Sequence, residues 1–149
     1  MFYIKCLAIF IGALGYAVIN NIPKKHLIAT AFVACLGYAV YMLFLPNEIL
    51  GCFLGACVIA GMGEIFARTL KDAATLFILP GIIPLVPGAK MYNMTLSLLN
   101  QDFSTAATLG VQVLMYAGSI AIAILLVSST IRSTVNHLHR MSKKTDKKN

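Results

Sequence analysis

The sequence predicts an all-α membrane protein with about five transmembrane helices, and two observations predict it. The first is composition: 59% of the residues are hydrophobic, 11% are charged and the mean hydropathy is +0.84, far from the make-up of soluble domains. The second is patterning, because apolar runs of spanning length alternate with short polar connectors. A soluble core in a chain of 149 residues cannot absorb so much apolar surface, so lipid is the expected solvent.

Four of these runs are long enough to cross a bilayer without interruption. A spanning helix needs about 20 mostly apolar residues, and runs of that length with few interior charges occur at residues 2–20, 27–45, 49–67 and 105–128. The first run has only Lys5 as an early positive charge and ends in Asn20 and Asn21 without a signal-peptide cleavage site. We therefore expect it to be a retained span.

The remaining apolar segment, residues 73–99, is interrupted by proline and glycine. As one straight helix it would be about 40 Å long at about 1.5 Å per residue, against about 30 Å of hydrocarbon. This fourth segment is therefore predicted to bend, unwind or continue along the outer surface. The residues that break it are Pro80, Gly81, Pro84, Pro87 and Gly88.

Basic residues predict the orientation of the chain, because short cytoplasmic loops carry an excess of Lys and Arg. Lys24 and Lys25 share one connector, Arg68 and Lys71 share another, and Arg132 precedes a basic tail. The intervening turns carry acids and amides instead. Five crossings with the N-terminus outside and the C-terminus inside satisfy the rule, whereas a re-entrant fourth segment would leave four crossings and violate it.

Residues 131–149 form the predicted basic cytoplasmic tail, next to a transmembrane domain of residues 1–130. Residues 131–141 carry an apolar face suited to a helix at the inner membrane interface. Aromatic residues do not interleave with the basic ones, so anionic lipid and not nucleic acid is the expected neighbour of the tail. The four cysteines lie inside apolar runs without a C-x-x-C pair, so they are interpreted as packing residues, and neither a metal nor a cofactor is expected.

The Pro80–Gly88 block is the first candidate for a functional site. Its three prolines remove backbone donors and clash with carbonyls four positions earlier, and lipid tolerates such backbone only where protein or trapped water satisfies the freed groups. Broken helices of this kind build substrate sites in transporters, and a half-helix is predicted to start at Gly88 to Lys90. A kinked span without a ligand is the alternative. Lys90 and Tyr92 are either ligands or interfacial anchors.

The second candidate lies around Glu64, a carboxylate near the predicted cytoplasmic end of the third span. A charge at the centre of a span costs about 2.5–3.5 kcal/mol and usually marks an ion or proton path. Both a coupling carboxylate and an interfacial anchor fit the position of Glu64. If the helix continues through the following turn, residues four apart share a face, and the pairs would be Glu64–Arg68, Arg68–Asp72 and Lys71–Thr75.

Gly51 and Gly55 have the G-x-x-x-G spacing in the third span, a pattern that lets membrane helices approach closely. We interpret them as helix-packing residues. Enzyme chemistry finds little support, because the three histidines lie in a connector or the tail and no H-E-x-x-H or G-x-S-x-G motif occurs. The chain is therefore not expected to be an enzyme.

These motifs together resemble the threonine/serine exporter family, in particular the short subunit of its two-component version, over residues 15–130. The resemblance implies secondary export of small polar metabolites across the bacterial inner membrane, threonine and serine for single-chain members and succinate for some paired ones. It also implies a larger partner subunit with a soluble domain followed by five spans. The motifs that carry it are the Pro80–Gly88 block with Tyr92 and, more weakly, Asn21-Ile-Pro-Lys-Lys, Gly37-Tyr38, Glu64-x-x-x-Arg68-x-x-Lys71 and Ala74-Thr75.

The sequence thus predicts a multi-pass subunit of a secondary transporter in the bacterial inner membrane, working with a larger membrane subunit. A non-transporting assembly subunit, whose Gly51–Gly55 face holds a partner, is the alternative. The substrate stays open, because a zwitterion needs an acceptor such as Glu64 and a dicarboxylate would prefer basic residues. The residues expected to bind substrate or line its path are Glu64, Arg68, Lys71, Thr75, Pro80, Gly81, Pro84, Pro87, Gly88, Lys90 and Tyr92.

Overall fold

The structure, a computed structural model, describes residues 2–146 and the side chains of residues 4–134. All regular structure in the described residues is helical, which confirms the predicted all-α class. Three short 3-10 turns, η1 (Lys24–His26), η2 (Leu45–Asn47) and η3 (Ile83–Leu85), lie between α-helices. The α-helices are α1 (Phe2–Ile19), α2 (Leu27–Leu43), α3 (Glu48–Leu70), α4 (Thr75–Ile82), α5 (Gly88–Leu99) and α6 (Phe103–Asp146).

Three stretches are long and apolar enough to cross a membrane, namely Lys24–Leu43, Leu45–Leu70 and Phe103–Thr134. The stretches Thr75–Leu85 and Gly88–Leu99 qualify as a fourth when they are taken as one broken span, with a bend of 56° between them. The predicted break in the fourth segment is thus confirmed. The other apolar helix, Ile4–Ile19, is shorter, so five crossings and their orientation stay a prediction.

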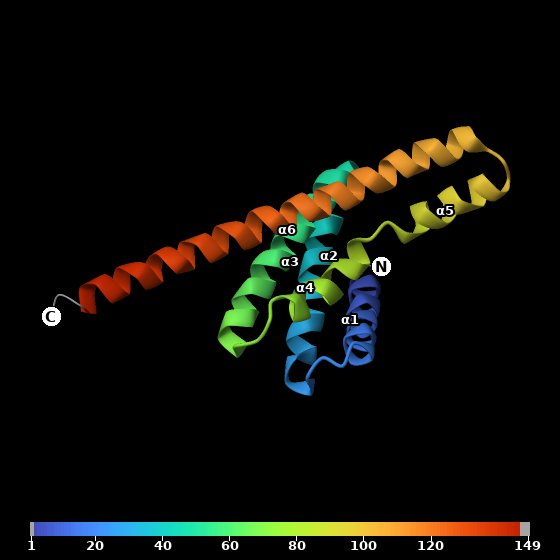
Figure 1. The fold of residues 1–149 in the computed structure, drawn as a ribbon. Coiled ribbons are helices and arrows are strands. Elements are labelled where there is room, and N and C mark those ends of the chain that lie inside the picture. Colours follow the sequence, from blue (N-terminus) through green and yellow to red (C-terminus); the bar gives the residue numbers. More distant parts are fainter. Residues whose placement is uncertain (1, 147–149) are drawn as a thin grey trace.

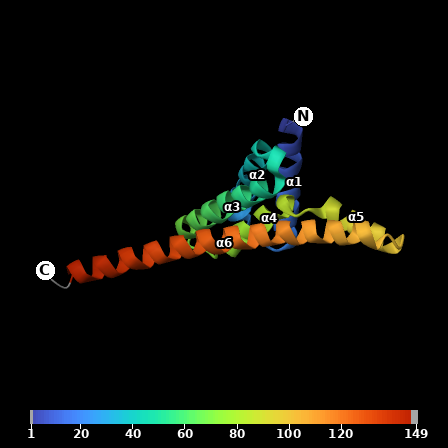
Figure 2. The ribbon, with the colours of Figure 1, turned by 90° about the horizontal axis from the view of Figure 1, so that it is seen from above.

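Helices α1, α2 and α3 stand side by side, with α4 packed against α2 and α3 (Figure 1). Helix α6 crosses this bundle obliquely over α3, and its first turns run back along α5. Seen from above, α6 lies along one flank of the bundle and α1 lies on the side away from it (Figure 2). The helix α5 and the start of α6 therefore form a hairpin that projects from the bundle.

Left-handed residues end the first and third helices. Asn21 follows α1 with a φ of 53°, and Pro23 then prevents the helix from resuming. Lys71 ends α3 with a φ of 55°, and the Asp72 N–H donates to the Ala67 carbonyl at 2.9 Å, which is the bond of a Schellman motif. Helix α3 therefore does not continue through residues 71–75.

This helix end removes the condition on which two of the side-chain pairs depended, a helix that continues through the turn. Arg68–Asp72 and Lys71–Thr75 would need a continuous helix, whereas the left-handed Lys71 turns the chain away. Asp72 instead pairs with the connector before α2. Glu64–Arg68 lies wholly inside α3 and does form, with Arg68 Nη2 at 3.5 Å from Glu64 Oε2.

Each proline of the fourth segment has a local consequence for the backbone. Pro80 lies inside α4, and Pro84 lies in the 3-10 turn η3. Val86 is extended, with a ψ of 128°, as expected of a residue that precedes proline. Helix α5 begins directly after Pro87. The chain therefore re-enters a helix in a new direction, and this turn sets the course of α5.

Small residues allow α2 and α3 to touch through their backbones. A Cβ atom added to Gly55 would lie 2.8 Å from the Gly37 carbonyl oxygen, and one added to Gly51 would lie 2.9 Å from that of Tyr41. The Gly51–Gly55 face is thus occupied by α2 of the same chain. The buried core beside it consists of Val33, Cys52, Ala56, Ile59, Ile78, Leu85, Tyr116, Ile120 and Ala123.

Helix α6 comprises 44 residues, which at about 1.5 Å per residue makes it about 66 Å long, twice the hydrocarbon thickness. It begins after Asp102, whose Oδ1 accepts a hydrogen bond from the Thr105 N–H at 3.1 Å. It passes residue 130, the predicted end of the membrane domain, without a break. The tail charges after Thr134 lie outside the described side chains, so the cytoplasmic tail stays a prediction.

We predict that Gly55→Ala destabilises the protein and that Gly12→Ala does not. The methyl group of Gly55→Ala would press on a backbone oxygen at 2.8 Å, and overpacking of this kind costs about 1–3 kcal/mol. Gly12 lies inside α1 with nothing within 4 Å of an added Cβ, and alanine is the better helix former. Thermal unfolding in one detergent measures both variants. Equal melting temperatures would contradict the close contact of α2 with α3.

Candidate functional site

Lys90 lies at the centre of a polar cluster, which we call the Lys90 cluster and which also contains Glu48, Gln112 and Tyr116. Its Nζ atom is 2.8 Å from Glu48 Oε2, 3.1 Å from Tyr116 Oη and 3.3 Å from Gln112 Oε1. The Tyr116 hydroxyl also hydrogen-bonds to Glu48. The Lys90 ammonium therefore has an acceptor for each of its three protons, and its bond to Glu48 is charge-assisted.

Three helices that are distant in the sequence supply this cluster. Glu48 is the first residue of α3, Lys90 lies in the first turn of α5, and Gln112 and Tyr116 are one turn apart on α6. The bend before Gly88 sets the position of Lys90, because α5 begins only after the chain has turned. Tyr116 is buried, whereas 43% of the Glu48 side chain and 31% of the Lys90 side chain are exposed. Both charges are therefore accessible to a solute.

The Lys90 cluster stands between two hollows. A groove of about 1080 Å³ has Glu48, Lys90 and Tyr116 in its wall and is otherwise mostly apolar, with Pro46, Asn47, Ile49, Leu50, Phe53, Met115, Ser119 and Ile122. A cavity of about 200 Å³ shares the same three residues and adds Tyr41 and the proline segment from Pro84 to Ala89. The groove has the size of a small-molecule site. A solute inside it would meet the charges with the broken backbone behind them.

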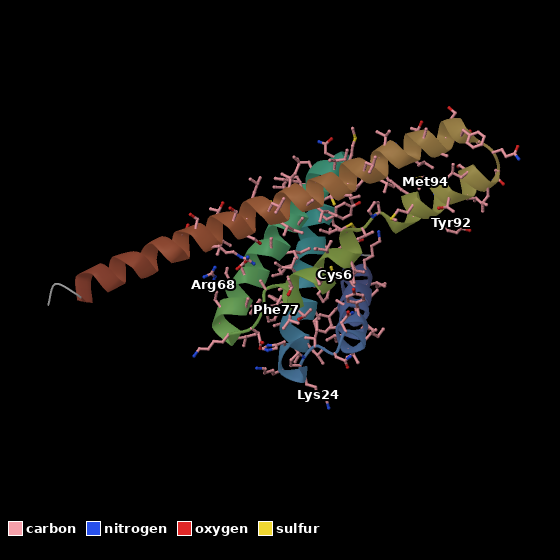
Figure 3. The ribbon with its side chains drawn as sticks, viewed as in Figure 1. Cys6, Lys24, Arg68, Phe77, Tyr92 and Met94 are labelled. Carbon is pink, nitrogen blue, oxygen red and sulfur yellow. The ribbon has the colours of Figure 1, made fainter. Side chains whose placement is uncertain are left out.

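The site residues predicted in the fourth segment lie in three separate parts of the structure. Pro80 and Gly81 are buried in α4, where a Cβ on Gly81 would lie 2.7 Å from Ile59 Cγ2. Tyr92 is 69% exposed and lies out on the hairpin, whereas Phe77 lies inside the bundle (Figure 3). Four other predicted residues, Pro84, Pro87, Gly88 and Lys90, contribute to the lining of the small cavity.

Glu64 forms a second charged cluster, which joins α3 to α6. Its side chain is 5% exposed, and it accepts hydrogen bonds from Arg132 Nε at 3.2 Å and from Arg68 Nη2 at 3.5 Å. The two arginine side chains are 36% and 66% exposed, so their guanidinium groups reach outwards. Neither Lys71 nor Thr75 is hydrogen-bonded to Glu64 among the described side chains. This geometry favours an anchor between two helices over a free coupling carboxylate.

His26 and Asp72 form a third cluster, which joins the connector before α2 to the connector before α4. His26 Nε2 lies 2.6 Å from Asp72 Oδ2, and Lys25 Nζ lies 3.3 Å from the same oxygen. The hydrogen bond with His26 and, next in size, that with Lys25 lower the pKa of the Asp72 carboxyl group, because both favour its charged form. The His26 side chain is fully buried, and the Phe77 ring meets it edge-on at 5.4 Å.

Sequence reasoning missed most partners in these clusters, although α6 carried a signal. Gln112 and Tyr116 are polar residues four apart in an apolar span, a spacing that puts them on one face. No such signal marked the other missed partners. In the sequence they look like residues of a turn (Glu48), the tail (Arg132) and a connector (His26). Only the folded chain brings each of them to an opposite charge.

A chain of several apolar helices, with one span broken at prolines and paired charges beside the break, has the features of a polytopic membrane protein. The family model described as Threonine/Serine exporter, ThrE, matches residues 5–130. The chain belongs to this family, which confirms the resemblance to the threonine/serine exporter family found in the motifs.

A relative from Haemophilus influenzae, described as an uncharacterized protein, is 29% identical to the chain over 92 residues. The match covers 60% of this chain and 31% of the relative. The chain therefore spans about a third of the length of that protein. No solved structure matches the chain.

We predict that Arg68→Gln and Arg132→Gln together cost more stability than the sum of the two single changes. Each guanidinium group alone still compensates Glu64, whereas the double variant leaves a buried carboxylate unpaired, a loss of about 3–5 kcal/mol in other buried pairs. Thermal unfolding in detergent measures all three variants. Adding Glu64→Gln to the double variant should restore stability. Strictly additive losses without that rescue would show that the two arginines do not share Glu64.

Proposed function

We propose that the chain is one subunit of a secondary transporter that exports a small polar metabolite across the bacterial inner membrane together with a larger membrane subunit. Membership of the threonine/serine exporter family supports the class of function. The observation that carries the residue-level proposal is the Lys90 cluster, which exposes two opposite charges to a groove beside a broken span.

Paired charges at this position fit substrate binding better than packing. Ionisable residues within a membrane span are expensive and commonly mark a transport path. The Glu64 carboxylate is enclosed, whereas the Glu48 carboxylate and its partner Lys90 both keep a substantial exposed fraction. Substrate groups of opposite charge can therefore replace the two side chains as each other's partner.

The two signs of charge favour a zwitterion as the substrate. The carboxylate of an amino acid would bind to the Lys90 ammonium and its ammonium group to the Glu48 carboxylate. The hydroxyl of threonine or serine would find hydrogen-bond partners in Gln112 and Tyr116. A dicarboxylate such as succinate is the second candidate. It would be attracted to Lys90 and repelled by Glu48.

A larger partner subunit is proposed because the groove is open rather than enclosed by this chain. The hairpin beside it exposes several large apolar side chains, which a second membrane subunit would cover. Covering this face would close the groove around the Lys90 cluster. The exposed residues are Met91, Leu96, Leu98, Leu99, Phe103, Val111, Leu114 and Met115.

The alternative function, a non-transporting assembly subunit, loses its predicted docking face. That interpretation relies on Gly51 and Gly55 to hold a partner, whereas both glycines lie against α2 of the same chain. It would be restored if the larger subunit transported the substrate by itself.

The direct test is efflux of preloaded labelled threonine, serine and succinate from cells that lack their own exporters. Three strains are compared, which express this chain, a candidate larger subunit encoded beside it, or both. Efflux only with both would establish a two-subunit transporter and name its substrate class. Equal efflux with the larger subunit alone and with both would contradict a transport role for this chain.

We predict that Lys90→Met lowers efflux at least tenfold and that Lys90→Arg retains a measurable part of it. Methionine keeps the apolar stem and removes the charge that pairs with Glu48, whereas arginine keeps the charge. Lys24→Met, which removes an exposed lysine at the first turn of η1, is the matched control. Membrane levels of both subunits are measured in parallel. Wild-type efflux by Lys90→Met would exclude the Lys90 cluster as the substrate site.

A further inference from the structure

We propose that His26 is the proton-binding residue that couples export to a proton gradient, with Asp72 holding its imidazole ring in place. This inference rests on the proposed transport function, and it concerns a cluster at the other end of α3 from Lys90. It assigns a chemical role, reversible binding of one proton, to a residue that binds no substrate in that proposal.

The surroundings of His26 are those of a proton acceptor held in one orientation. The ring is fully buried, and its Nε2 is 2.6 Å from Asp72 Oδ2. When Nε2–H donates to that carboxylate, the lone pair of the neutral ring is on Nδ1. Nδ1 is also buried and has no hydrogen-bond partner among the described residues. The ring thus presents one enclosed acceptor position.

The charged groups that face His26 are few and come from two connectors. The Asp72 carboxylate is one of them, and Lys25, the neighbour of His26 on η1, contacts the same Asp72 oxygen as His26 does. Helix α2 contributes the Thr30 hydroxyl, which donates to the His26 carbonyl at 2.9 Å, and α4 contributes the Phe77 ring. Neither α2 nor α4 contains an Asp, Glu, Lys, Arg or His residue. Asp72 is therefore the anion available to stabilise a charged ring.

His26 also has the chemistry that the other clusters lack. Imidazole is the side chain whose ordinary pKa lies between pH 5 and 8. The acids of the other two clusters face Lys90 and two arginines, which keep their charge across that range. The other two histidines, His137 and His139, lie outside the described side chains.

Burial of Nδ1 makes proton binding depend on a change in packing. The atom is enclosed in the present packing, and the Phe77 ring of α4 lies against the imidazole, so a proton from water would reach the lone pair only when the packing around the ring opens. Binding makes an Nδ1–H bond and turns the ring into an imidazolium ion, which strengthens the hydrogen bond from Nε2–H to the Asp72 carboxylate. Release reverses both changes. Helix α4 is the first half of the broken span. Each cycle of proton binding and release at His26 would therefore also move the proline segment.

The test compares His26→Gln with the wild type in vesicles that contain both subunits. Glutamine can still donate a hydrogen bond to Asp72 and cannot take up a proton in the neutral range. Exchange of labelled threonine at equal pH on both sides should stay within twofold of the wild type. Net threonine movement driven by a pH gradient should fall at least tenfold and lose its pH dependence. Lys24→Gln, on the same turn, is the control and should behave as the wild type.

Each outcome separates this inference from the proposed function. A wild-type complex that does not exchange threonine would overturn threonine transport itself and the coupling role that rests on it. A wild-type complex that exchanges, with His26→Gln still driven by the pH gradient, would overturn the role of His26 alone. Loss of both exchange and net movement would assign His26 to folding or substrate binding, again against the proposal.

A second measurement does not depend on transport. Nitrogen-15 spectra of the complex labelled at histidine, with His137 and His139 replaced by glutamine, report the protonation of His26 directly. We expect the wild-type ring to bind a proton under the conditions in which a pH gradient drives net transport, and Asp72→Asn to weaken that binding, because the imidazolium ion loses its counter-charge. A ring that stays in one protonation state under those conditions, or that binds the proton equally well in Asp72→Asn, would overturn the proposal.

Discussion

The arrangement of the chain depends on one constraint, which is that backbone groups in lipid need partners while three prolines deny the fourth segment a regular helix. The chain ends α4 at Ile82, makes one 3-10 turn and restarts as α5 at Gly88, bent by 56°. Part of the irregular backbone is satisfied from within the protein, since Cys52 Sγ of α3 lies 3.7 Å from the Leu85 carbonyl oxygen. The same bend directs α5 out of the bundle and brings Lys90 to Glu48 and Tyr116.

Helix α3 lies at the centre of the helix contacts, since α2, α4 and α6 all pack against it. Gly51 and Gly55 let α2 lie against its backbone on one side, while α6 crosses it on another (Figure 2). Glu48 and Glu64 stand 16 positions apart along it, about 24 Å at about 1.5 Å per residue, and the span between them is apolar. The two charged clusters therefore sit at opposite levels of the helix, and each ties α3 to an element from a later part of the chain.

Much of the fold was accessible from the sequence because its causes are local. Apolar run length predicts the helices, and the spacing of Pro80, Pro84 and Pro87 predicts the break. The end of α3 was not accessible, since a lysine at position 71 gives no sign of the left-handed conformation that stops the helix. Within the clusters only the Glu64–Arg68 pair of α3 was accessible, because the other partners are 42, 46 and 68 residues apart in the chain. Pairing over such distances is decided by how helices cross, not by periodicity.

The exposed charges of the Lys90 cluster limit the kind of environment that can surround this part of the chain. Nearly a third of the Lys90 side chain and more than two fifths of Glu48 are uncovered by it. A charge that faces hydrocarbon is costly, while water or protein in the groove removes most of that cost. The apolar residues around the groove would hold little water if lipid covered them. The proposed larger subunit would supply a second protein wall, which would keep lipid out and leave room for a polar solute beside the exposed charges.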